Sequence, residues 1–109
     1  MGYTYNVTFV IAPADEQRLL GWIRGKALPM LFNEESPARN AALRKVVEAG
    51  GEKPGADHGV SIALHAEFEN ERLAKDWNDR VLIPALGNFH EEFGNNAIFF
   101  VTLLENLPL

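Results

Sequence analysis

The stretch from Trp22 to Asn33, WIRGKALPMLFN, is followed by a related stretch from Trp77 to Asn88, WNDRVLIPALGN. The tryptophans and the prolines of the two stretches share one offset, since 77 − 22 and 84 − 29 both equal 55. In a chain of 109 residues, this offset indicates that one supersecondary unit is used twice. We therefore expect a single domain, residues 1–109, with repeat halves of about 3–49 and 58–104.

The pattern of apolar residues predicts two strands and two helices. Apolar and polar residues alternate at 3–11 and at 60–68, which is typical of strands. Apolar residues at helical spacing follow each of these strands. A weaker apolar run predicts a strand at Leu43–Ala49, a continuous run predicts another at Ile98–Leu104, and the Gly- and Pro-rich residues 50–57 predict a turn.

The order strand, helix, strand, repeated once, predicts an α+β fold. Two such units interleave into a ferredoxin-like duplicated βαβ arrangement, a four-stranded antiparallel sheet with two helices on one face. Pro29 and Pro84 should bend or restart the two helices at equivalent places, because proline lacks the N–H that a helix interior needs. Trp22 and Trp77 are expected to anchor the core rather than to stack on a ligand.

Composition excludes several classes of function. A formal net charge of −5, with Lys and Arg scattered along the chain, argues against binding to a nucleic acid. No stretch approaches the roughly 20 apolar residues of a membrane helix. Cysteine is absent, which excludes disulfides and thiolate zinc sites and fits a cytoplasmic protein.

The last predicted strand points to a homodimer. Two helices cover one face of such a sheet, yet this strand is apolar on both faces. Burying a Phe or Leu side chain is worth roughly 1.5–3 kcal/mol, so we expect Phe99, Val101 and Leu103 to form a dimer interface between facing sheets, closing a dimeric α/β barrel. The alternative is that Asn106–Leu109 folds back over the strand.

Three segments carry a resemblance to a known family. They are Tyr5-Asn6-Val7-Thr8, Trp22 with Leu28-Pro29, and the closing residues 99–105, FFVTLLE. Over nearly its whole length the chain resembles a family of small uncharacterised bacterial proteins that is classed as a domain of unknown function. Members are similar to ferredoxin-like, dimeric α/β-barrel proteins, which include cofactor-free monooxygenases, haem-handling proteins and small isomerases. The resemblance implies a dimer and brings no agreed activity.

His65 is the first candidate for chemistry. Strand alternation places His65 and Glu67 on the uncovered face of the sheet, which Asn6 shares. An imidazole beside a carboxylate can act as a general base. The alternative is a half-buried polar residue at the dimer interface. Thr8, Ser61 and Thr102 are candidates for a small polar pocket on the same face.

The other histidines suggest no site. His90 is followed by Glu91 and Glu92, but neighbouring side chains on a helix point about 100° apart, so the three do not converge on a metal. His58 falls in the predicted turn. We therefore predict no bound metal and no cofactor.

Three functions remain open on these grounds. The first is a non-catalytic homodimeric module that binds a small molecule or a protein partner between facing sheets. The second is a small dimeric-barrel enzyme, of the cofactor-free monooxygenase or isomerase type, that uses His65. The third, which would overturn the prediction of no cofactor, is haem binding through His65 or His90.

Overall fold

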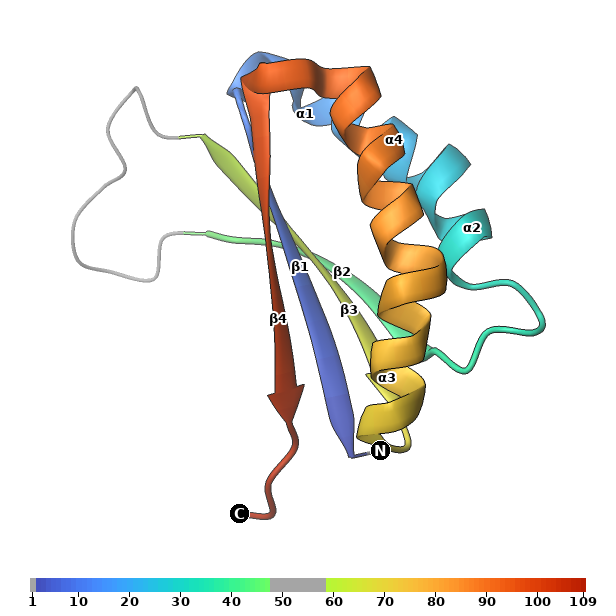
Figure 1. Cartoon of the computed structure of the whole chain (residues 1–109). Helices are drawn as coiled ribbons and strands as arrows, with labels where there is room; N and C mark the ends of the chain where they lie inside the picture. Colours follow the sequence, from blue (N-terminus) through green and yellow to red (C-terminus); the bar gives the residue numbers. More distant parts are fainter. Residues whose placement is uncertain (1, 48–58) are drawn as a thin grey trace.

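The computed structural model describes residues 2–47 and 59–109 (Figure 1). The helices form two long helical arms, residues 16–31 and residues 71–93. Each arm consists of two α-helical segments joined by a π-helical turn. Short 3-10 turns at Pro13–Asp15 and Gly94–Asn96 precede the first arm and follow the second. The strands are β1 Tyr3–Ile11, β2 Arg39–Lys45, β3 Val60–Phe68 and β4 Ala97–Glu105, and the α-helices are α1 Glu16–Trp22, α2 Leu28–Leu31, α3 Glu71–Trp77 and α4 Ile83–Phe93.

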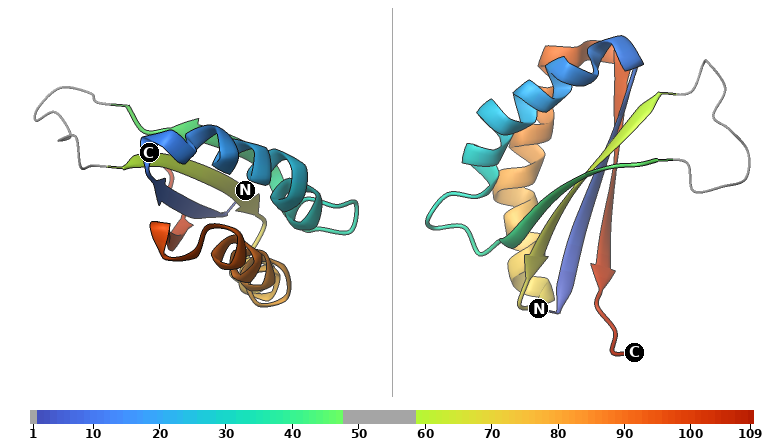
Figure 2. Two further views of the ribbon diagram at one scale, coloured as in Figure 1. Left: turned by 90° about the horizontal axis from the view of Figure 1, so that it is seen from above. Right: turned by 180° about the vertical axis from the view of Figure 1, so that it is seen from behind.

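The four strands form one antiparallel sheet in the order β2-β3-β1-β4. Both helical arms lie on the same side of this sheet (Figure 1 and the right view of Figure 2). The predicted α+β fold is thereby confirmed, including the antiparallel sheet with two helices on one face. The proposed division into repeat halves and the dimeric barrel stay predictions.

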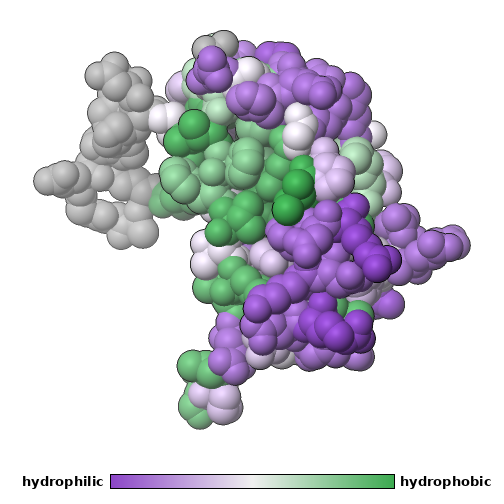
Figure 3. Space-filling view, viewed as in Figure 1, coloured by the Kyte–Doolittle hydropathy of each residue, from purple (hydrophilic) through white to green (hydrophobic). Residues whose placement is uncertain are grey.

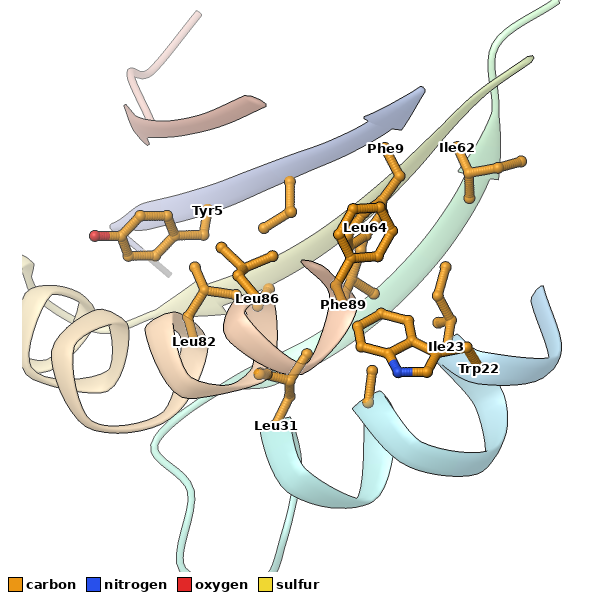
Figure 4. Close-up of a cluster of buried hydrophobic side chains, with 14 of the residues drawn as sticks. Tyr5, Phe9, Trp22, Ile23, Leu31, Ile62, Leu64, Leu82, Leu86 and Phe89 are labelled. Atoms are coloured by element: carbon orange, nitrogen blue, oxygen red, sulfur yellow. The ribbon is translucent and has the colours of Figure 1, made fainter. Parts of the chain in front are cut away.

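The core lies between the sheet and the helical arms (Figure 4). Alternate residues of β1 and β3 are buried there, as the alternation predicted: Tyr5, Val7, Phe9 and Ile11 from β1, and Ile62, Leu64, Ala66 and Phe68 from β3. The helices add Leu19, Ile23, Leu82 and Phe89 to the same cluster. The opposite face of the sheet has no helix over it, so its side chains are available to other contacts.

The prolines coincide with a π-helical turn in each arm. The turns cover Ile23–Ala27 and Asn78–Leu82, again 55 positions apart. In the first, the N–H of Leu28 donates to the carbonyl of Ile23, five residues back, immediately before Pro29. The Ile83 N–H and the Asn78 carbonyl do the same before Pro84. The wider turn accommodates a residue that has no N–H and whose ring would strike the carbonyl four residues back.

Each tryptophan joins the two helical arms. The indole N–H of Trp22 donates to Oδ1 of Asn88 at 2.8 Å, and that of Trp77 donates to the backbone carbonyl of Leu31 at 3.0 Å. Both rings are buried, which confirms them as core anchors.

One expectation needs correction, and one alternative is set aside. The second strand, expected at Leu43–Ala49, begins at Arg39 and ends at Lys45, because an edge strand is held by backbone pairing and needs few apolar side chains. Residues 48 and 49 of the expected strand lie outside the described residues. The tail does not fold back over β4. The N–H of Asn106 donates to the Gly2 carbonyl at 2.8 Å, which continues the β1–β4 ladder, and Leu107 is 73% exposed. The predicted turn at 50–57 lies outside the described residues.

Candidate functional site

The open face of the sheet carries a polar row across its middle. Asn6 on β1 lies opposite His65 on β3 and opposite Thr102 on β4. Ala42 on β2 lies opposite His65 on its other side, so the polar row ends at His65. The alternation of β1 and β3 therefore brings His65 and Asn6 together, as the sequence suggested.

Arg44 on β2 is the partner of His65. One guanidinium nitrogen of Arg44 lies 2.7 Å from Nδ1 of His65. Because a guanidinium only donates, Nδ1 must accept, and the single proton of the neutral imidazole is on Nε2. Burial of the ring, and secondarily the Arg44 charge, lower the pKa of His65 below its ordinary value. His65 therefore presents a donor, not a base, to the open face.

Glu67 is engaged by a different residue of β2. Its carboxylate accepts a hydrogen bond from the side-chain amide of Asn40. Asn40 has a φ of 53°, in the left-handed region that Asn tolerates well, and the β2–β3 register is irregular between Arg39 and Ala42. The sequence-predicted pair of His65 and Glu67 is thus divided between Arg44 and Asn40. Asn40 was missed because the strand was expected to begin at Leu43, and Arg44, although inside the expected strand, was missed because the strand carries no alternation that would place its side chain.

The three candidate pocket residues are not equally close to this row. The Thr8 hydroxyl donates to Oδ1 of Asn6 at 3.4 Å, and Thr102 lies directly opposite Asn6. Ser61 lies opposite Val10, one open-face position beyond Thr8, and is set apart from the row. Thr8 and Thr102 can both contribute to a polar contact around Asn6, whereas Ser61 could contribute only to a separate polar contact beside it.

The predicted interface residues lie on the other face of the sheet. Phe99, Val101 and Leu103 pair with Phe9, Val7 and Tyr5, whose side chains point toward the helices. The residues of β4 that share the open face are therefore Ile98, Phe100, Thr102 and Leu104. Because the sequence of β4 does not alternate, it could not show which residues of the strand face the helices. The pairing register with β1 shows this.

An apolar cleft of about 720 Å³ lies between β4 and α4, on the helix side. Phe99, Val101 and Leu103 form its strand wall, and Ile83 and Leu86 form its helix wall. Figure 3 shows hydrophobic side chains gathered on this side of the molecule. A smaller cleft of about 280 Å³ adjoins it and shares His90 and Phe99. The sequence signal for the cleft was an edge strand with apolar residues on both faces.

Tyr5 brings a polar group to the lining of this cleft. Burial raises the pKa of its phenol, and the Asp79 charge raises it further against an opposing effect of Lys75. The hydroxyl therefore stays protonated and available as a hydrogen-bond donor.

His90 also lines the cleft, as an exposed residue of α4. The nearby Glu92 pairs with Lys26 of the other helical arm at 2.6 Å, and this contact lowers the pKa of the Glu92 carboxyl. Within residues 2–47 and 59–109, no group of three or more metal-ligating side chains converges. His58 lies outside the described residues.

The fold and the open sheet define a small α+β protein with two helical arms and one uncovered sheet face. The chain belongs to the DUF4286 family, described as a domain of unknown function, whose model matches residues 2–107. No curated protein gives a match. No helix in the described part of the chain is long and apolar enough to cross a membrane.

Proposed function

We propose that the protein is a non-catalytic homodimeric module whose open sheet faces pack together and hold a small molecule or a protein segment between them. The observation that carries the proposal is the exposure of large apolar side chains on the open face of β4: Ile98 is 53%, Phe100 57% and Leu104 45% exposed. Grouped apolar side chains of this size favour association. A cytoplasmic location belongs to the same proposal and is supported by the lack of cysteine.

Two parts of the open face would have different roles in such a dimer. The apolar positions of β4, with Val10 beside Ile98, supply the area that association buries. The polar row of His65, Asn6 and Thr102 would supply hydrogen bonds to a ligand held between the sheets. Mostly apolar walls with a few fixed polar groups are typical of ligand sites.

The alternative, an enzyme that uses His65 as a general base, has less support. Nδ1 already accepts a hydrogen bond from Arg44, and the remaining nitrogen carries the ring proton. To accept a proton from a substrate, His65 would have to release Arg44 or become charged beside it. Loss of turnover of a candidate substrate in His65→Ala, with assembly intact, would instead favour the enzyme.

Light scattering of purified protein tests the dimer. We expect the wild type to form an oligomer with an even number of chains and Phe100→Lys to form a smaller species. Met30→Lys is the matched control, because Met30 is 40% exposed but lies on α2, away from the sheet. A monomeric wild type at micromolar concentration, or equal losses of mass in the two variants, would contradict the proposal.

A further inference from the structure

The two edges of the sheet differ in how they are protected. On β2, Arg39, Arg44 and Lys45 and the irregular register at Arg39–Ala42 are features that discourage the addition of another strand. On β4, Ala97–Glu105 has no basic residue and no proline, and its register with β1 is continuous. In the described part of the chain β4 pairs with β1 alone. Its outer edge has the character of a pairing surface.

The ladder shows which groups face this outer edge. The N–H of Asn106 donates to Gly2, the residue opposite it when the register is extended by one position. In an antiparallel pair, such hydrogen-bonded positions alternate with positions that point away from the neighbour. Leu104, Thr102 and Phe100 thus direct their N–H and C=O groups to β1. Phe99, Val101, Leu103 and Glu105 direct theirs to the outer edge.

The side chains of Phe99, Val101 and Leu103 line the cleft beside α4. One set of residues therefore offers backbone hydrogen bonds at the edge and an apolar groove next to it. An extended segment that paired with β4 would place every second side chain over this groove.

The tail of the chain has the pattern that such a segment needs. Leu107 and Leu109 have the same parity as Val101 and Leu103, and both are exposed. Pro108 lies at the other parity, so its missing N–H is not one that the outer edge would use.

We propose that β4 pairs antiparallel with β4 of a second copy, about a two-fold axis perpendicular to the sheet. With such an axis, the helices of both copies lie on the same face of the joined sheet. Each odd-numbered residue of one β4 then lies opposite an odd-numbered residue of the other. Leu107 and Leu109 of each copy then extend over the cleft between β4 and α4 of the other. The contact is self-complementary, because the same chain supplies both the groove and the segment that fills it.

This edge contact goes beyond the proposed function, because it uses a surface other than the open face. Facing sheets are related by a two-fold axis parallel to the sheets, whereas the edge contact has an axis perpendicular to them. Two perpendicular two-fold axes that intersect generate an assembly of four chains. The β4 strands of an edge pair would also join their open-face apolar residues, Ile98, Phe100 and Leu104, into one stripe for the facing contact.

A variant in the tail tests the edge contact without disturbing the core. We expect Leu107→Ser with Leu109→Ser to raise the dissociation constant of this contact at least about tenfold, because the burial of two leucines is lost in each copy. By light scattering, the wild type should contain four chains, the tail variant two, Phe100→Lys two, and the combined variant one.

The outcomes separate the two proposals. A tail variant with the wild-type mass overturns the edge contact. A wild type of two chains that becomes monomeric only with Phe100→Lys overturns the edge contact and supports the facing sheets. A wild type of two chains that becomes monomeric only with the tail variant supports the edge contact and overturns the facing sheets.

Cross-linking gives a second measurement, since the chain has no cysteine of its own. Phe99→Cys, Val101→Cys and Leu103→Cys each place one thiol on the helix side of β4, where it meets its own counterpart only across the edge. We expect at least one of them to give a covalent dimer with a short bifunctional maleimide. Met30→Cys, on α2, should give none. Absence of a cross-link from all three β4 variants overturns the proposal.

Discussion

His65 is held in its neutral form by its surroundings at the middle of the open face. Its burial, and then the Arg44 charge, lower its pKa below 6.5. The unfolded chain therefore takes up a proton at this residue at a higher pH than the folded chain does. The contribution of neutral His65 to the free energy of unfolding is fully present above pH 6.5 and is lost as the pH falls toward the lowered pKa.

We predict that the free energy of unfolding decreases as the pH falls below 6.5 and that His65→Gln reduces this decrease. Urea unfolding at a series of pH values measures the effect. Arg44→Gln is the companion variant: an NMR titration should show the pKa of His65 higher than in the wild type, because one of its two causes has been removed. An unchanged pKa in Arg44→Gln would show that the guanidinium contact does not act on the imidazole.

At this scale the sequence predicted neighbours along regular strands and missed neighbours across the irregular one. Alternation in β1 and β3 was sufficient to place Asn6 beside His65. Arg44 and Asn40 were not foreseen as partners, because β2 has exposed charged residues and a bulge that carry no periodic signal. The chemistry assigned to His65 depended on those partners, so it changed once they were known.

At the scale of elements, the repeat was the strongest predictor. Equal offsets of the tryptophans and prolines led to helices that are altered at equivalent places, and both π-helical turns occur there. The fourth strand was predicted almost to the residue, yet its two faces were exchanged. Apolar content located the strand, but only pairing with β1 fixes which of its residues face the helices.

The end of the second helical arm depends on Gly94. Its φ of +59° and ψ of −143° form a conformation that residues with a Cβ rarely adopt. Apart from Gly94 and its two chain neighbours, no heavy atom of the described residues lies within 4 Å of the position that a Cβ would occupy, so a substitution would be penalised by the backbone rather than by a clash. This turn sets the direction in which the chain enters β4.

We predict that Gly94→Ala lowers the free energy of unfolding by about 1–3 kcal/mol. Gly21→Ala is the matched control: Gly21 lies within helix α1 with equal space around it, and alanine there should be neutral or stabilising by up to about 1 kcal/mol. Urea unfolding of both variants measures the difference. Equal stabilities would show that the conformation of Gly94 is not needed to end the helix.

At the scale of the whole molecule, the apolar residues divide into two groups with separate effects. The cluster between sheet and helices is closed within one chain, whereas Phe100 and its open-face neighbours on β4 remain exposed in it. The first group should determine the stability of the chain, and the second its association. Because association adds to the stability of a folded chain by mass action, the two effects can be separated by protein concentration.

We predict that the thermal unfolding midpoint of the wild type rises with protein concentration. Phe100→Lys should weaken this dependence while leaving the midpoint at high dilution nearly unchanged, since Phe100 is 57% exposed in the single chain. Phe68→Leu, at a fully buried position, should lower the midpoint at every concentration and keep its slope. Calorimetry over a wide concentration range makes the comparison. If the slope were the same in Phe100→Lys as in the wild type, the open face would have no part in assembly, and the exposed side chains of β4 would need another explanation.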